Sequence, residues 1–159
     1  MKKIIAVAAA LVLTAGAAAE TVKLRLNGVL CDGCKGEIIT AIVKVKGADV
    51  KTEPTKANPV AVVVYDEKKT DLGAIAKAIA EADTPHKSDQ APAAFLVLEA
   101  KGLTDAAAKK LPDALAKVKG VDAKMSKAEV KGKEIHIRLD DKGGAKLDDI
   151  KKALADLLK

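Results

Sequence analysis

Apolar and charged residues alternate along residues 21–27, where Val22, Leu24 and Leu26 are separated by Lys23 and Arg25. This period of two predicts a strand with one buried face. The pattern then changes, because apolar residues recur at spacings of three and four between positions 38 and 45, just before a glycine. That change predicts a helix directly after the strand.

The same kind of reading extends along the rest of the chain. Alternating or continuous short apolar runs predict strands, and amphipathic runs with capping residues predict helices. A second helix begins at Thr70 or Asp71, either of which can cap it. The other predicted elements are strands at 48–53, 60–65, 95–100, 123–130 and 134–139, and helices at 71–82, 105–118 and 146–158.

This order of elements occurs twice. Residues 30–34, Leu-Cys-Asp-Gly-Cys, align with residues 103–107, Leu-Thr-Asp-Ala-Ala, and the Lys-Val-Lys-Gly of 44–47 recurs at 117–120. We therefore expect two copies of one strand-helix-strand-strand-helix unit, in an α+β fold. The predicted organisation is a leader at 1–19, a first domain at 20–86, a linker at 87–93 and a second domain at 94–159.

Each unit lacks the fourth strand that usually closes an open-faced sandwich of this type. The polar stretch 85–90 is a poor strand, and no residues remain after the last helix. Because an unpaired strand edge favours pairing with another strand, we expect the two first strands to lie against one another and join two small sheets into one. In that arrangement, the strand at 95–100 serves both units.

The amino terminus has the pattern of a secretory signal peptide. Lys2 and Lys3 precede an uncharged run, and three alanines at 17–19 offer a cleavage site before Glu20. The run is too short and too rich in alanine for a membrane anchor, so we expect no stable membrane insertion after cleavage and a periplasmic or secreted location.

Charge and composition argue against binding to nucleic acid. Cleavage of the leader removes two lysines and lowers the formal net charge of +6 by two. The remaining lysines are interspersed with acidic residues, and the chain has one tyrosine and one phenylalanine, so no basic patch carries aromatic side chains for base stacking.

The two cysteines of the chain, Cys31 and Cys34, stand three apart where the strand pattern gives way to the helix pattern. Two thiolates at a helix start can face one ion, and the helix dipole favours their negative charge. Sulfur ligands select soft ions such as Cu(I) and also Zn(II). A structural disulfide is the weaker interpretation, because such a bridge closes too short a loop to stabilise much.

A strand followed by Gly-x-x-Cys-x-x-Cys, a helix, two strands and a helix resembles the heavy-metal-associated domain. The resemblance covers residues 21–86, and the second copy is a degenerate echo of it. It implies a ferredoxin-like fold for each unit, with Cys31 and Cys34 binding one soft ion, Cu(I) or Hg(II), with Zn(II) as a further candidate. It also implies a partner that exchanges metal, such as a membrane metal transporter. The sequence shows no nucleophile-base-acid set and no phosphate loop, so we expect no enzymatic activity.

Two positions depart from that family's pattern. Val29 replaces the usual methionine, and the aromatic residue often found after the second helix is absent. His86 lies in a loop that is beside the metal site in the family fold, so it is a candidate third ligand, although a solvated surface histidine is the simpler interpretation.

Three other residues have competing interpretations. Asp32 could offer an oxygen to zinc, but its recurrence as Asp105 in the copy without thiols favours a helix-capping role. Lys35 could stabilise a thiolate, although exposed lysines are usually only solvated. His136 alternates with two isoleucines and is expected to face solvent, so a zinc site made of both cysteines, His86 and His136 would need the two copies to converge.

Two other functions remain open at this level. A Cys-x-x-Cys at a helix start also occurs in thiol-disulfide oxidoreductases, although the order of elements and the lack of an aromatic residue before Cys31 count against that function. Alternatively, the chain is an interaction module in which the copy without thiols binds a partner.

Overall fold

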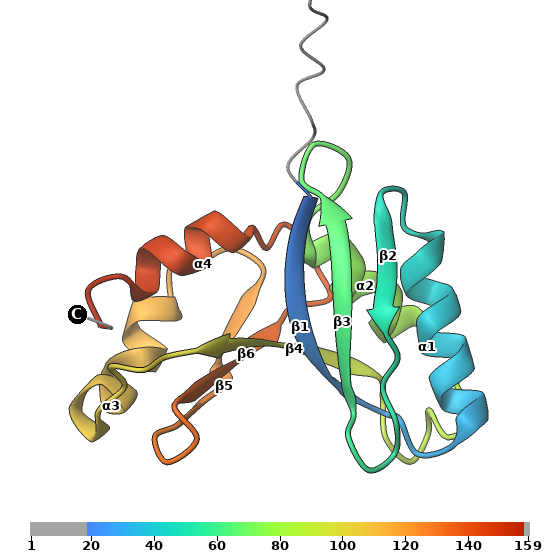
Figure 1. Ribbon diagram of the computed structural model, residues 1–159, viewed down its shortest axis with the longest axis horizontal. Coiled ribbons are helices and arrows are strands. Elements are labelled where there is room, and N and C mark those ends of the chain that lie inside the picture. Colours follow the sequence, from blue (N-terminus) through green and yellow to red (C-terminus); the bar gives the residue numbers. More distant parts are fainter. Residues whose placement is uncertain (1–18, 158–159) are drawn as a thin grey trace, which may run out of the picture.

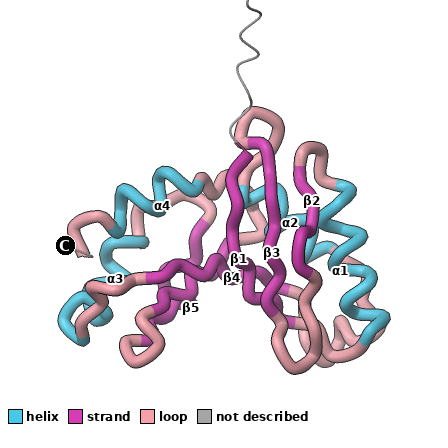
Figure 2. The backbone as a smooth tube through the Cα atoms, viewed as in Figure 1, coloured by secondary structure: helices cyan, strands magenta, loops and turns pink. Residues whose placement is uncertain are grey.

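The computed structural model describes residues 19–157, and the expected leader, apart from Ala19, lies outside this range. The described chain forms six strands and four helices (Figures 1 and 2). In chain order they are β1 (Ala19–Asn27), α1 (Asp32–Lys44), β2 (Ala48–Thr52), β3 (Val60–Asp66), α2 (Leu72–Glu81), β4 (Ala93–Glu99), α3 (Asp105–Leu115), β5 (Val121–Glu129), β6 (Glu134–Leu139) and α4 (Leu147–Leu154). The predicted order of elements is confirmed.

All six strands belong to one sheet, in the order β2-β3-β1-β4-β6-β5, and every neighbouring pair is antiparallel. The first copy, β1 to α2, supplies one half of the sheet, and the second copy, β4 to α4, supplies the other half. The halves are related by a pseudo-twofold axis near Leu24 and Leu96, which are register partners. Figure 1 shows the strong twist between the two halves.

The junction between the copies is the pair of first strands. β1 runs beside β4 from the Lys23–Val97 pair to the Asn27–Ala93 pair. β4 therefore takes the place of the fourth strand of the first unit, and β1 does the same for the second unit. The expectation that the first strands join two small sheets into one is confirmed, and it explains how two three-stranded units avoid an exposed central edge.

Helices cover one face of the sheet. Leu24, Ala61, Leu96 and Ile137 follow one another across four neighbouring strands in register, and all four are fully buried. They belong to a single apolar core that also contains the buried faces of all four helices. The two copies thus share one core, and the side chains of the opposite face of the sheet make a separate outer surface.

The copies also meet between α2 and the loop before α4. The backbone N–H of Gly73 donates to the carbonyl of Ala145 at 3.3 Å. A Cβ atom at position 73 would lie 2.2 Å from the backbone nitrogen of Gly144, far inside van der Waals contact. Glycine is therefore required here by the close approach of two backbones.

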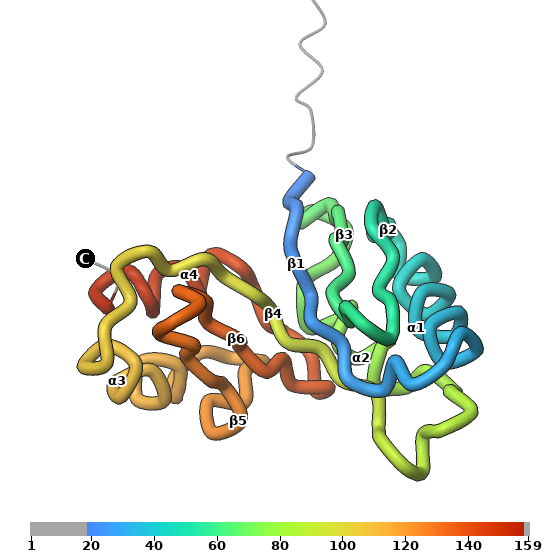
Figure 3. The backbone as a smooth tube through the Cα atoms, turned by 60° about the horizontal axis from the view of Figure 1, so that its bottom comes forward, coloured from blue at the N-terminus to red at the C-terminus, as the bar shows by residue number. Residues whose placement is uncertain are grey.

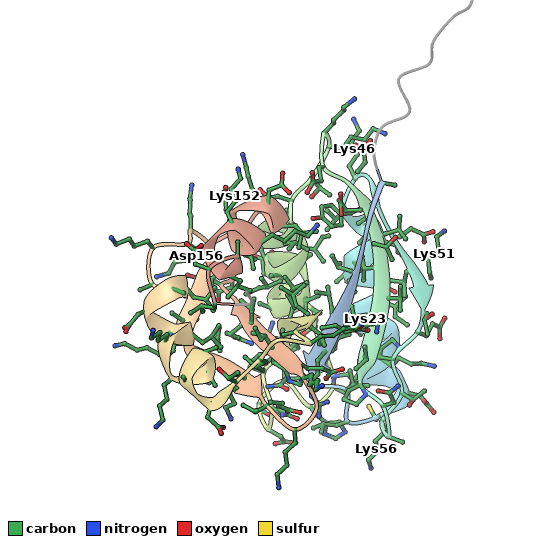
Figure 4. All side chains as sticks on the ribbon, turned by 60° about the vertical axis from the view of Figure 1, so that its left-hand side comes forward. Lys23, Lys46, Lys51, Lys56, Lys152 and Asp156 are labelled. Carbon is green, nitrogen blue, oxygen red and sulfur yellow. The ribbon has the colours of Figure 1, made fainter. Side chains whose placement is uncertain are left out.

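The surface agrees with the expected scatter of charge. Lys46, Lys51, Lys56 and Lys152 project outward from different parts of the two copies (Figure 4). No helix within residues 19–157 is long and apolar enough to cross a membrane.

Candidate metal site

The loop between β1 and α1 holds both cysteines and is shaped by Gly28. This glycine has a φ of +84°, a conformation that side chains disfavour, and a Cβ atom there would lie 3.0 Å from the Cα atom of Pro92. Val29 follows it and is buried in the core. Val29 thus anchors the loop in the core, and residues 90–92, which lead into β4, pack against the loop at Gly28.

Cys31 is the N-cap of α1. Its extended backbone precedes the helix, and its sulfur accepts a hydrogen bond from the backbone N–H of Cys34 at 3.2 Å. The predicted capping role of Asp32 is wrong, because Asp32 is already the first helical residue, where its charge favours the helix dipole. The second copy has the same arrangement, since the Thr104 hydroxyl accepts from the N–H of Ala107 at 3.2 Å.

The two sulfur atoms face one another at a distance of 2.8 Å, and both cysteines are free thiols. Cys34 is fully buried, whereas Cys31 is only partly buried. Burial raises the pKa of Cys34, but the hydrogen bond with Cys31 and the backbone hydrogen bonds of Leu30, Cys31 and His86 outweigh it and hold this pKa below its ordinary value. The structure therefore favours a thiolate at the base of the site.

The segment after α2 brings His86 to this site. One ligand atom from each of Cys31, Cys34 and His86 lies within 4.8 Å of the other two. Pro85 packs over Gly33, with its Cγ atom 3.4 Å from the position of a Cβ there. Figure 3 shows this yellow-green segment running below the start of α1. The His86 side chain is a candidate ligand from the sequence, whereas no sequence pattern indicates the contact of its backbone with Cys34.

The imidazole ring of His86 is itself in contact with a carboxylate. Its Nδ1 atom lies 3.2 Å from an oxygen of Asp89, and its side chain is about half exposed. A carboxylate that accepts from one ring nitrogen fixes the ring and leaves the other nitrogen for an ion, an arrangement common among metal-binding histidines. Beside it, the hydroxyl of Thr84 is buried and has no hydrogen-bond partner within the described residues.

Lys35 follows Cys34 in sequence but is engaged elsewhere. Its ammonium group lies 3.4 Å from a carboxylate oxygen of Glu53 in the segment after β2. This ion pair holds the ammonium group of Lys35 beside Glu53, where the carboxylate offsets its charge. The structure thus favours the hydrogen bond with Cys31 and the backbone hydrogen bonds, rather than Lys35, as the support of a thiolate.

His136 is not at this site, and the expectation that it faces solvent is wrong. It lies on the outer face of β6, as its alternation predicted, but its relative exposure is only 8%. Glu129 and Glu134 flank its ring, and the three residues form a second cluster of potential ligands. The two copies therefore do not converge on a zinc site shared by the cysteines and both histidines.

Comparison with known proteins finds relatives that are named for mercuric transport. It is 36% identical over 92 residues to the mercuric transport protein periplasmic component of Pseudomonas aeruginosa, which covers 57% of this chain and all of the relative. It is 37% identical over 87 residues to the protein of the same name from Serratia marcescens, covering 54% of this chain and 94% of that relative. No protein-family model matches the chain.

Two solved structures are also similar. One is oxidized MerP from Ralstonia metallidurans CH34, with 37% identity, 43% of this chain and 93% of that chain covered, and a TM-score of 0.38. The other is the water-soluble region of the P-type ATPase CopA from Bacillus subtilis, with 20% identity, 87% of each chain covered and a TM-score of 0.40.

The chain matches these two relatives over 94% or more of their length, at 36% and 37% identity, and this match shows the family to which it belongs. The chain belongs to the family of the mercuric transport protein periplasmic component, a family of heavy-metal-associated domain proteins. The match covers little more than half of the chain, which leaves room for the second copy of the repeat.

Proposed function

We propose that this protein is a periplasmic carrier of one soft metal ion, Hg(II) or Cu(I), which Cys31 and Cys34 bind as thiolates. The observation that carries the proposal is the pair of free thiols 2.8 Å apart at the start of α1, one of them with a lowered pKa. The relatives named for mercuric transport support mercury as the cargo and the periplasm as its place.

Binding requires the two sulfurs to separate. Metal–sulfur bonds of about 2.3 Å hold two sulfurs as much as about 4.6 Å apart in a linear arrangement. Cys34 is buried on the helix, whereas Cys31 is partly exposed on the loop, so Cys31 makes most of this movement. Its hydrogen bond from the N–H of Cys34 is then lost, and the metal–sulfur bonds replace it.

His86 supplies a third ligand for ions that accept three. Its Nδ1 atom is held by Asp89, so the free Nε2 atom is the one that binds. Imidazole suits copper and zinc, and a two-coordinate Hg(II) ion does not need it. His86 therefore favours copper and zinc, whereas the cysteine pair alone is sufficient for mercury.

Transfer to a partner follows from the openness of the site. The accepting protein, such as a membrane metal transporter, presents a thiolate that bonds to the ion while the bond to Cys31 breaks. Cys31 leaves as a thiolate and takes a proton from solvent, and a second exchange releases Cys34. Because a bond forms as each bond breaks, the ion is never free, and no catalysis by the carrier is required.

Titration of the reduced protein tests this function. We expect saturation at one Hg(II) or Cu(I) per chain, and no tight binding by the Cys31→Thr/Cys34→Ala variant, which reproduces the loop of the second copy and keeps its cap. His86→Ala should weaken Cu(I) binding and leave Hg(II) binding nearly unchanged. Unaltered binding by the double variant would overturn the assignment of the cysteines.

The competing oxidoreductase function has its own readout. Reduction of insulin by the dithiol protein should not exceed the rate given by a small dithiol. The thiol with the lowered pKa is the fully buried Cys34, whereas reactive cysteines are partly exposed. Turnover that requires both cysteines would contradict the carrier function as stated.

A further inference from the structure

We propose that the second copy holds a metal site of different chemistry, in which His136 and Glu129 bind a borderline divalent cation such as Zn(II) and Glu134 orients the histidine. This site is on the outer face of the sheet, and its existence does not depend on the carrier function of the cysteines. Its donors are one imidazole nitrogen and carboxylate oxygens, which suit zinc and related ions.

The two copies differ systematically on this face. Aligning Asp66 with Asp140 places Val60, Val62 and Val64 of β3 where Glu134, His136 and Arg138 stand in β6. The first copy thus has three valines at these positions, and the copy without thiols has acidic, imidazole and basic groups. A strand needs only a β-branched residue here, as the valines show, so the polar set requires another explanation.

The strand register puts carboxylates side by side. Glu134 is the direct cross-strand partner of Glu99 on one side and of Glu129 on the other. Like charges directly opposite one another destabilise a sheet unless a cation lies between them. Glu99 is paired with Lys23 at 3.1 Å, and within the described residues the side chains of Glu129 and Glu134 contact the imidazole of His136 instead of a lysine or arginine.

The imidazole has the geometry of a metal ligand with an orienting partner. Its Nε2 atom lies 3.2 Å from Glu134, and its Nδ1 atom lies 3.5 Å from Glu129. One ligand atom from each of the three residues lies within 4.8 Å of the others. Glu134 can accept from the Nε2–H group and fix the ring, which leaves Nδ1 as the donor to the ion.

A hollow of about 330 Å³ gives access to the Nδ1 side. It is lined by His136 and Glu129 but not by Glu134, and Asn27, Phe95 and Met125 also line it. Met125 reaches this surface because β5 bulges: Asp122 pairs with Arg138 and Lys127 with His136, so the residues between them leave the ladder. The hollow leaves room for water to complete the coordination.

Two cations limit the affinity. Arg25 and Lys127 line the same hollow, and Lys127 is the direct cross-strand partner of His136. Arg138 is stacked over the ring of Phe95, at 5.3 Å, and is thus held to one side. Repulsion from Lys127 makes this site weaker than a pair of thiolates and gives a specific test, because its removal should strengthen binding.

Calorimetric titration with Zn(II) alone tests the site in the Cys31→Thr/Cys34→Ala protein, which removes the thiols and keeps both copies. We expect one ion per chain at micromolar zinc, with affinity at least about tenfold weaker after His136→Val, the residue of the first copy. Lys127→Gln should tighten binding, and His86→Ala should not change it.

Two results would overturn this metal site. If the protein without thiols binds no zinc, or if binding survives His136→Val, the three residues are only an ion-paired network and the proposal is wrong. Should His136→Val fail to fold, Glu129→Gln gives the same test, because that side chain is 58% exposed and can be changed without loss of the core. Loss of zinc binding in folded Glu129→Gln protein supports the site.

Discussion

The first and second copies make the same hydrogen bond at the start of their first helices with different atoms. A sulfur of Cys31 accepts from position 34 at 3.2 Å, and an oxygen of Thr104 accepts from position 107 at 3.2 Å. The two copies thus have the same backbone geometry at this point, whereas the thiols that could hold a soft ion are in the first copy. The loop geometry belongs to the repeat, and the soft-metal chemistry belongs to two sulfur atoms.

On the outer face of the sheet, the second copy has the potential metal ligands and the first copy has apolar side chains. The outer face of β3 is formed by valines, and that of β6 by Glu134, His136 and Arg138. The copy that lacks thiols is therefore the one with an imidazole between carboxylates. The comparison teaches that the two copies share one backbone and present different potential ligands, two sulfurs in the first and an imidazole with two carboxylates in the second.

The largest expected effect comes from removing residues 93–159. The first copy would then lose β4 from the edge of β1 and the apolar surface that the two copies share. We expect loss of cooperative unfolding, because about 5 kcal/mol is the whole stability of a small domain. Thermal unfolding followed by circular dichroism measures this, with the intact chain as the control. A fragment that unfolds at the same temperature as the intact chain would show that the copies are independent.

A smaller change should transfer the chemistry from one copy to the other. Thr104→Cys together with Ala107→Cys places two thiols on a loop that already has the required cap. We expect the number of bound Hg(II) ions to rise from one to two per chain in a titration. Thr104→Ser with Ala107→Ser is the matched control and should leave it at one. An unchanged ratio in the cysteine variant would mean that the segment at 84–86, and not the loop alone, defines the site.

The smallest effect tests the contact between the copies. Gly73→Ala forces a Cβ atom against the backbone of Gly144, and we expect a loss of about 1–3 kcal/mol in the free energy of unfolding. Gly36→Ala is the matched control, because no atom lies within 4 Å of a Cβ there and α1 should gain about 0.5–1 kcal/mol. Urea denaturation measures both, and equal effects would argue against close contact at Gly73.

Much of the fold could be predicted from the sequence because it rests on local patterns. Apolar residues at spacings of two predict the strands, and those at spacings of three and four predict the helices. The missing fourth strands predict the pairing of β1 with β4. The recurrence of Asp32 as Asp105 predicts an aspartate cap for α1, yet the N-cap is Cys31. The alignment of Cys31 with Thr104 held the correct answer, since threonine is a favoured cap.

The surroundings of the two histidines could not be predicted in the same way. Alternation gave the correct face for His136, but that face is not solvent there, because Glu129 of the neighbouring strand β5 and Glu134 of the same strand β6 lie around it. The register of β5 depends on a bulge between Asp122 and Lys127 that no periodicity indicates. His86 was a candidate from its family resemblance, and only the three-dimensional path of residues 83–92 brings it near the thiols.

The pairing of β1 with β4 makes this chain the covalent equivalent of a dimer in which two sheets join edge to edge. Each half is completed by a strand that belongs to the other, so neither half can open at this seam without uncovering the core of both. A substitution on either strand therefore alters the stability of the cysteine-bearing half and of the cysteine-free half together. A half without thiols thus still serves the half that carries them, because its strand β4 covers the edge of β1 and its apolar residues complete the shared core.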